Sequence, residues 1–469
     1  MRGYANFSTD LLLHHVSACR SVPDARGGHT SAARRRRDER SAGLAGESDD
    51  ACRCAESAES QNSAILKAKA DLEAQHGVSI QTRAIALPRV QATGQYRAVE
   101  EGRIEVPSTP GFGSLFSQNA QSWNMGLQVV QSIYEGGRIQ ASLRTARLLK
   151  EQAVLDYQTV VADALLAVRI AYDDALQATN EIVVREASVA LLTKQLEDTK
   201  RRFDAGIVPQ FNVLRAEVEL ANARPPLIRA RNNYRISKQR LLNDLGLSLP
   251  RSVLEDVPLL LADALRAEPY EIDLSTALPE ALDRRTELAS LRKAEELRKE
   301  GVRTAKSGYK PSVQLFAGYG VQNRQFETDL TAENHGWEAG ARLSWDMWDG
   351  ALTSGKIREA RARHERVLVD LDDVSRRIEL EVRTAYSTFI EAKEVLESQG
   401  KVNEQAVEAL RLSNSRYHAG SGTQLDTLSA QTALTDARTT YVRSLHDYSV
   451  ARSRLERALG RGITMEKKP

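Results

Sequence analysis

The sequence RFDAGIVPQFNVL (residues 202–214) returns as RYHAGSGTQLDTL (residues 416–428), 214 positions later. The same offset holds without a gap from Gly126 to Gly246, and 15 of the 45 positions from 202 to 246 are identical in the second copy. A repeat of this length indicates one structural unit used twice, and such units bury their apolar faces against one another. The fold therefore has to be inferred from one copy together with its partner copy.

Each quoted pattern ends a very long helical segment. Residues 138–205 contain neither Gly nor Pro, and residues 356–419 are interrupted only by Gly400. Apolar side chains recur at steps of three and four residues, which is the period of a helix, as in Val161, Leu165, Val168, Tyr172 and Leu176. At 1.5 Å per residue the first segment predicts a helix about 100 Å long.

A second helix follows each long one. Gly206 and Gly420 stand directly after the last periodic residues, where glycine stops a helix, and return helices are predicted over 208–245 and 423–459. Each copy is therefore an antiparallel helical hairpin whose apolar stripe requires bundle or coiled-coil packing. Pro225 and Pro226 stand inside the first return helix, and we expect a kink or a local break there.

Two segments with a period of two precede each long helix. Their alternating apolar positions are Val90, Ala92, Gly94 and Tyr96; Trp123, Met125, Leu127 and Val129; Val313, Leu315, Ala317 and Tyr319; and Trp337, Ala339, Ala341, Leu343, Trp345 and Met347. Such alternation with polar residues predicts amphipathic strands. Pro88 and Pro311 mark the switch from helix to strand. Four strands with one apolar face cannot seal a membrane barrel alone. Either the sheet packs on protein in a soluble molecule, or several chains contribute strands to one barrel.

Composition excludes several classes of function. The net charge of +2 gives no case for nucleic acid, and no apolar run reaches the 18 residues that a spanning helix needs. Only three cysteines occur, all within the first 54 residues. We find no HExxH motif, complete phosphate-binding loop, GxGxxG motif or nucleophile elbow. We therefore expect no enzyme, and no catalytic, cofactor or metal site.

The first 60 residues differ from the rest. They carry the run Arg34–Arg37 and many Ser and Ala, with no helical or strand period. Such a segment is typical of a solvated, disordered stretch. Our hypothesis is a mis-assigned start that replaces an export signal, because no export signal is recognisable here.

Together these patterns resemble the TolC-type outer-membrane efflux family, over about residues 61–460. The resemblance rests on the two tip patterns, on the turns at Tyr134–Gly137 and Trp348–Gly350, on the ends Leu245-Gly246 and Leu459-Gly460, and on Arg285-Thr286-Glu287-Leu288, which is similar to the segment that opens the second repeat of such proteins.

The resemblance implies a mainly α fold with a small β part. Three chains would form a 12-stranded β-barrel in the lipid of the outer membrane and a 12-helix α-barrel tunnel across the periplasm. The expected organisation is an atypical N-terminus (1–60), a first repeat (61–246), an inter-repeat equatorial segment (247–285), a second repeat (286–460) and a tail (461–469). The homotrimer would be a passive exit duct of a tripartite efflux or type I secretion system for small molecules or exported proteins. A periplasmic adaptor and an inner-membrane pump would open it.

The resemblance also implies sites. The hairpin ends that dock the adaptor correspond to Ala205, Gly206 and Ile207 and to Ala419, Gly420 and Ser421. The residues at the periplasmic entrance correspond to Asn212, Asp426 and Ser429. A ring of Asp426 carboxylates would favour cations, although Asn212 and Ser429 stand where some members carry Asp. The alternative for Asp426 is a carboxylate that caps a helix N-terminus.

Two other functions remain open from the residues alone. A soluble coiled-coil scaffold explains the helices but leaves the four alternating strands unexplained. A periplasmic adaptor also has a helical hairpin, but it carries one hairpin with barrel-like soluble domains. Here two copies occur, with strands before each.

Overall fold

The computed structural model describes residues 51–100, 121–247, 259, 261, 263–323 and 333–462. All of them lie in one compact unit that begins at Ser48. The run of residues 1–50, including Arg34–Arg37, lies outside the described residues. Within the described part, no helix is both long enough and apolar enough to cross a bilayer.

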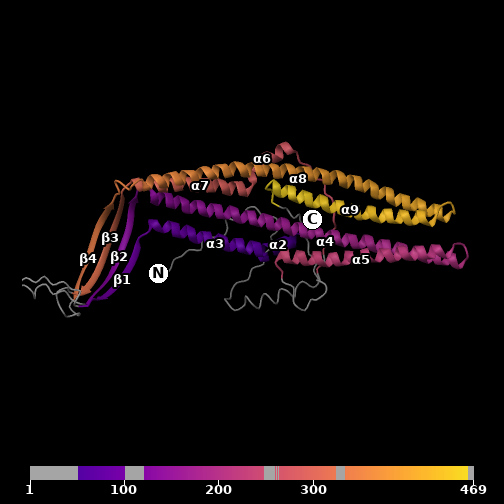
Figure 1. The fold of residues 1–469 in the computed structure, drawn as a ribbon, viewed down its shortest axis with the longest axis horizontal. Helices are drawn as coiled ribbons and strands as arrows, with labels where there is room; N and C mark the ends of the chain where they lie inside the picture. The colour runs from indigo at the N-terminus through magenta and orange to yellow at the C-terminus, as the bar shows by residue number, and fades with distance from the viewer. Residues whose placement is uncertain are drawn as a thin grey trace, which may run out of the picture. The chain divides into compact units, whose positions relative to one another are not determined.

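Two pairs of very long helices dominate the unit (Figure 1). Helices α4 (Arg138–Asp204) and α8 (Leu352–His418) have 67 residues each. Helices α5 (Gln210–Leu245) and α9 (Gln424–Ala458) return along them. The first residues of both pairs stand 214 positions apart, which is the offset between the two copies in the sequence.

A shorter helix and a 3-10 turn lead into each sheet segment. Helix α3 (Ser63–Arg83) is followed by η2 (Ala84–Ala86), and α7 (Thr286–Lys306) by η4 (Ser307–Tyr309). Pro88 and Pro311 then separate each turn from a strand that begins one residue later. These two strands begin 223 positions apart, whereas α4 and α8 begin 214 positions apart. The first copy therefore has nine more residues between the start of its first strand and the start of its long helix.

Four antiparallel strands form one sheet in the order β1-β2-β3-β4. They are β1 (Arg89–Ala98), β2 (Gln121–Glu135), β3 (Ser312–Asn323) and β4 (Glu333–Ser344). Leu127 stands opposite both Ala92 and Tyr319, and Tyr319 stands opposite Trp337. Partners in register share a face of the sheet, so the four apolar sets predicted from the sequence lie on one face.

Strand β4 is shorter than its alternation predicts. Trp345 and Met347 continue the apolar pattern, but the strand ends at Ser344, opposite Ser312. The residue before Ser312 is Pro311, which has no N–H to donate and therefore cannot extend the ladder. The prediction that the strand reaches Met347 was wrong because its neighbour ends first.

Each hairpin has its own core. In the first, Val168, Tyr172, Leu241 and Leu245 are buried with Cys54 and Ala58 of α2 (Ala51–Gln61). In the second, Ile378, Val382, Phe389, Tyr448 and Leu455 are buried together. Helix α2 begins within the first 60 residues, where the sequence shows no helical period. The period was missed because the buried positions of α2, Cys54 and Ala58, are small residues that carry little hydrophobic signal.

The segment between the copies crosses both hairpins. The Tyr172 hydroxyl of α4 donates to Asp263 at 2.9 Å, and the Tyr448 hydroxyl of α9 donates to the Glu268 carbonyl at 2.7 Å. Helix α6 (Leu274–Arg284) follows, and Arg461, just beyond α9, forms a bidentate pair with its Glu280 at 2.9 and 2.7 Å. This segment therefore links α4 to α9 near the middle of the long helices.

Helix α5 is continuous from Gln210 to Leu245, with Pro225 and Pro226 inside it. A local break does not occur there. Leu220 and Ala230, on either side of the prolines, are both buried. Packing on both sides of the pair therefore holds the backbone helical although two N–H donors are missing.

Candidate functional site: the tips of the helical hairpins

The first tip joins α4 to α5 through a left-handed glycine. Gly206 has φ +72°, its N–H donates to the Phe203 carbonyl at 2.8 Å, and the Ile207 N–H donates to the Arg202 carbonyl at 2.9 Å. This pair of bonds is the Schellman arrangement that ends helices. Helix α5 then begins after Pro209, whose side chain offers no cap.

The second tip repeats this turn and adds a cap. Gly420 has φ +76°, and its N–H and that of Ser421 donate to the Tyr417 and Arg416 carbonyls at 3.2 and 2.9 Å. At the start of α9, the Thr423 hydroxyl accepts from the Asp426 N–H and the Asp426 carboxylate accepts from the Thr423 N–H. This reciprocal capping box is absent from the first tip.

The six residues predicted to dock an adaptor are all exposed, namely Ala205, Gly206, Ile207, Ala419, Gly420 and Ser421. One of the six, Ile207, is a large apolar side chain that is 69% accessible, and the nearby Phe211 is 67% accessible. Apolar side chains gathered at an exposed turn favour a protein partner over solvent. The geometry leaves these six residues available to a partner, and their docking role stays a prediction.

The predicted entrance residues differ in their surroundings. Asp426 and Ser429 are exposed, whereas Asn212 is half-buried. The bonds from the Thr423 backbone N–H and the Thr423 side chain hold the pKa of Asp426 below its ordinary value. Asp426 therefore does cap a helix, which is one of its two predicted roles. Capping leaves its charge facing solvent, so the entrance role stays a prediction.

The two tips are joined by contacts that the sequence did not predict. The Arg202 guanidinium lies 3.0 Å from His418 Nδ1 and 4.5 Å from the centre of the Tyr417 ring. The buried Gln424 side chain donates to the Thr199 hydroxyl at 3.3 Å and to the Asn212 carbonyl at 3.2 Å. These six residues bridge the end of the first hairpin to the end of the second. Five of them belong to the tip patterns, which is their only sequence signal, and Thr199 lies just before the first pattern.

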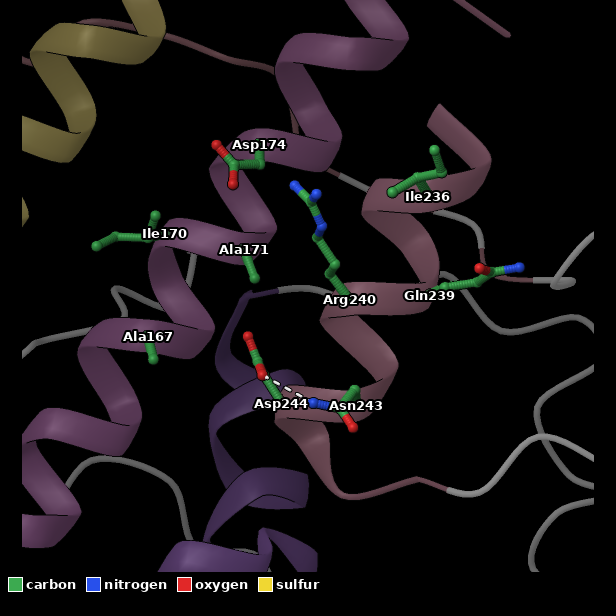
Figure 2. A pocket seen from close by; sticks show the side chains of 9 residues that line it. All are labelled: Ala167, Ile170, Ala171, Asp174, Ile236, Gln239, Arg240, Asn243 and Asp244. Carbon is green, nitrogen blue, oxygen red and sulfur yellow. Dashed lines mark hydrogen bonds between the residues drawn. The ribbon is translucent and has the colours of Figure 1, made fainter. Parts of the chain in front are cut away.

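Away from the tips, a cleft of 520 Å³ opens between α4 and α5. Figure 2 shows its lining, with Asp174 and Ala171 on α4 facing Arg240 and Asp244 on α5. The cleft lies about 30 residues, or roughly 45 Å of helix, from the tip. Its charged side chains are mixed with alanines and isoleucines and include no nucleophile with a base. Among the described residues, no three His, Cys, Asp or Glu side chains gather as metal ligands would.

Known proteins share the sequence pattern and the fold described above. The family model described as Outer membrane efflux protein matches residues 54–247 and 277–461. The outer membrane protein TolC of Escherichia coli is 22% identical over 73% of this chain and 70% of its own length. The alkaline protease secretion protein AprF of Pseudomonas aeruginosa is 25% identical over 69% and 65%. The crystal structure of the outer membrane protein VceC from Vibrio cholerae superimposes with a TM-score of 0.72 at 18% identity, over 88% of this chain and 97% of VceC.

Proposed function

Because this chain belongs to the outer membrane efflux protein family, we propose that three copies of it assemble into one exit duct. The chain is an outer-membrane channel protein with a periplasmic helical part, of the class used in tripartite efflux and type I secretion. Each chain contributes four strands and four long helices to a shared wall.

The observation that carries the proposal is the register of the sheet. All four apolar sets lie on one face, and Trp337 on that face is 80% exposed. Strands β1 and β4 each end the sheet with an unpaired edge in the described part of the chain. Unpaired edges are not tolerated in lipid, so closure needs strands from other copies. Three chains would give 12 strands with Trp and Leu toward lipid and polar side chains toward water.

The helices carry the passage away from the membrane. Helix α4 begins at Arg138, after the turn of two glycines that follows β2, and its 67 residues span about 100 Å. Figure 1 shows the sheet at one end of the long helices and both tips at the other. We infer that the tips are the periplasmic entrance, where an adaptor docks and an inner-membrane pump supplies the energy.

Opening would separate the two hairpins. The contacts of Arg202 with His418 and Tyr417 join the ends of α4 and α8, and that of Gln424 with Asn212 joins the starts of α9 and α5, so the two tips are held together in this conformation. An adaptor that binds the exposed tips more tightly when these contacts are broken would shift the population toward an open mouth. The duct itself performs no chemistry, and its cargo would be small molecules or exported proteins.

A charge at the second tip tests the docking role. Gly420→Glu should abolish export of a transported compound, because a carboxylate is placed at the centre of the exposed turn. The trimer should persist, since no side chain lies within 4 Å of a Cβ at this position. Export is read as drug resistance of producing cells, and assembly as the oligomer in outer-membrane fractions.

The matched control is Gly420→Asn, which accepts positive φ but adds no charge. We expect Asn to retain most of the export. Unchanged resistance with Gly420→Glu would place the docking surface elsewhere. Recovery of the wild-type protein as a monomer free of membranes would contradict the duct and favour a soluble scaffold.

A further inference from the structure

The polar face of the sheet has an unequal distribution of charge. Residues that pair in register form rows that run across all four strands. One row on this face consists only of side-chain amides, namely Gln95, Asn124, Gln322 and Asn334. The neighbouring row of Thr93, Gly126, Gly320 and Gly336 carries almost no side chains. Most of this face is therefore neutral, and the few charges on it dominate its potential.

Three arginines and one glutamate belong to this face. Arg89 and Arg97 alternate with the apolar residues of β1, and Glu338 and Arg342 alternate with those of β4. Glu333 lies on the apolar face, because it and its partner Asn323 are in step with the apolar residues of β4 and β3. Glu135, at the helical end of β2, is buried and paired with Arg138. With Glu135 neutralised by Arg138, the remaining strand charges give this face a net charge of +2 per chain, three arginines less one glutamate.

These charges are not neutralised within the described part of the chain. Arg89, Arg97, Glu338 and Arg342 are all exposed, and none forms an ion pair there. The Arg342 guanidinium lies 5.7 Å from the Phe316 ring centre, a cation–π contact that holds it on the polar face and leaves its charge unpaired.

Exposure indicates that this face is the inside of the curve. From Leu315 to Gly320 along β3, the apolar-face residues are exposed while Phe316, Gly318 and Gly320 of the polar face are half-buried. The hollow side of a curved sheet faces inward when a barrel closes. The Trp-bearing side then faces lipid.

We propose that the polar face lines a passage that favours anions, through Arg89, Arg97 and Arg342 opposed by Glu338. The inference rests on the proposed trimeric duct. Three copies would place nine arginines against three glutamates in the barrel, and rings of arginine favour anions over cations in a pore. Asp426 at the tips has the opposite sign, but it lies about 100 Å away along the helices. Screening at ordinary salt confines each effect to its own end. The substrate class that passes the barrel most easily is therefore negatively charged solutes.

Reversal potentials in planar lipid bilayers test this directly. The purified full-length protein is measured under a potassium chloride gradient at low salt, where screening is weakest. Replacing all three arginines (R89Q/R97Q/R342Q) should lower the ratio of chloride to potassium permeability by about twofold or more. Glu338→Gln should raise the ratio, because it removes the opposing charge from the same face.

Controls separate charge from damage. Gln128→Asn changes the same face without changing charge and should leave the ratio at the wild-type value. Single replacements such as Arg97→Gln give a smaller shift of the same sign if the triple variant does not assemble. A conducting channel whose ratio is unchanged in the arginine variants, or moves the same way with Glu338→Gln, would overturn the anion preference. A wild-type protein that forms no conducting channel would instead contradict the duct itself.

Discussion

Gly246 and Gly460, which end the two return helices, each satisfy two separate constraints. Both have positive φ, +76° and +70°, a conformation that side chains with a Cβ resist. Both also touch the last residue of another helix, which is Gln61 of α2 for Gly246 and Arg284 of α6 for Gly460. A Cβ on Gly246 would lie 2.1 Å from the Gln61 carbonyl oxygen, and one on Gly460 would lie 3.0 Å from the Arg284 carbonyl carbon. Glycine at these positions therefore lets a helix end pass directly over another backbone.

Replacing Gly246 by alanine should destabilise the protein strongly. The left-handed backbone alone costs about 1–2 kcal/mol, and the clash with backbone atoms cannot be relieved by turning a side chain, so we expect about 3 kcal/mol or more in total. Thermal unfolding of the detergent-solubilised protein measures the loss.

Gly206 provides the matched control. It has φ +72° but nothing within 4 Å of an added Cβ, so Gly206→Ala should cost only about 1 kcal/mol. Equal losses for the two variants would show that conformation alone, and not the close approach at Gln61, makes Gly246 necessary.

At the scale of elements, charged side chains join α4 of the first hairpin to α9 of the second. His446 on α9 lies 2.8 Å from Asp174 on α4 and 3.0 Å from Asp447 on its own helix. One turn away, the Ser449 hydroxyl donates to the buried Asp173 at 2.7 Å. Burial lowers the pKa of His446, but its hydrogen bonds to the two aspartates outweigh burial, and the pKa is raised above its ordinary value.

This joint should weaken as the pH rises. A histidine with a raised pKa in the folded protein contributes stability that is complete below its unfolded pKa and is lost as pH rises through the folded pKa. We therefore expect the unfolding temperature of the wild type to fall relative to His446→Gln as the pH rises above about 6.5, the ordinary pKa of histidine. The measurement is thermal unfolding of both proteins across pH 5 to 9.

The comparison with His446→Gln is needed because Asp173 also has a raised pKa, caused first by burial. Its contribution has the same sign and persists in the variant, where loss of the nearby His446 charge would raise the pKa of Asp173 further. If the difference in unfolding temperature between the two proteins did not change with pH, the ion pairs of His446 would not hold this joint.

The elements themselves could be predicted because their signals are local. The first hairpin was predicted from the run without Gly or Pro that begins at residue 138 and from the turn at Gly206. One strand was predicted from the alternation around Leu127. What failed depended on neighbours that the local sequence does not contain. Strand β4 stops at Ser344 because of Pro311 on the adjacent strand, and α5 continues through Pro225 because of its packing.

The site was predicted less completely for the same reason. The exposed tips followed from glycines in the two patterns, whereas the link from Arg202 to His418 joins residues 216 positions apart. A second such link is the joint at the end of α9, where the Arg285 side chain pairs with Glu381 at 2.8 Å and donates to the Ala458 carbonyl at 3.3 Å. Asn62, 223 positions earlier, donates to the Asp244 carbonyl at the matching end of α5. Only the folded chain shows that the Asn62 amide and the Arg285 guanidinium both donate to a backbone carbonyl at the end of a return helix.

At the scale of the whole molecule, everything proposed depends on which face of the sheet meets lipid. Exposure differs between the two faces along β3, but both faces of β1 are fully exposed in the single chain, so the assignment is tested by substitution. Leu127 and Gln128 are adjacent in β2, the strand that pairs with both β1 and β3, and they point to opposite faces. They are therefore a matched pair, with the same strand, depth and backbone environment and different surroundings after assembly.

Leu127→Lys should prevent assembly into the outer membrane, whereas Gln128→Lys should be tolerated. A lysine facing lipid near the middle of a barrel wall costs about 2–4 kcal/mol per chain, and three chains would bear this cost together. A lysine in a water-filled passage stays hydrated. Outer-membrane fractionation and recovery of the trimer measure assembly, and bilayer recordings then show whether the assembled Gln128→Lys protein favours anions more strongly than the wild type. If Gln128→Lys failed to assemble while Leu127→Lys succeeded, the sheet would be inside out relative to the proposal, and the anion-favouring passage would be wrong with it.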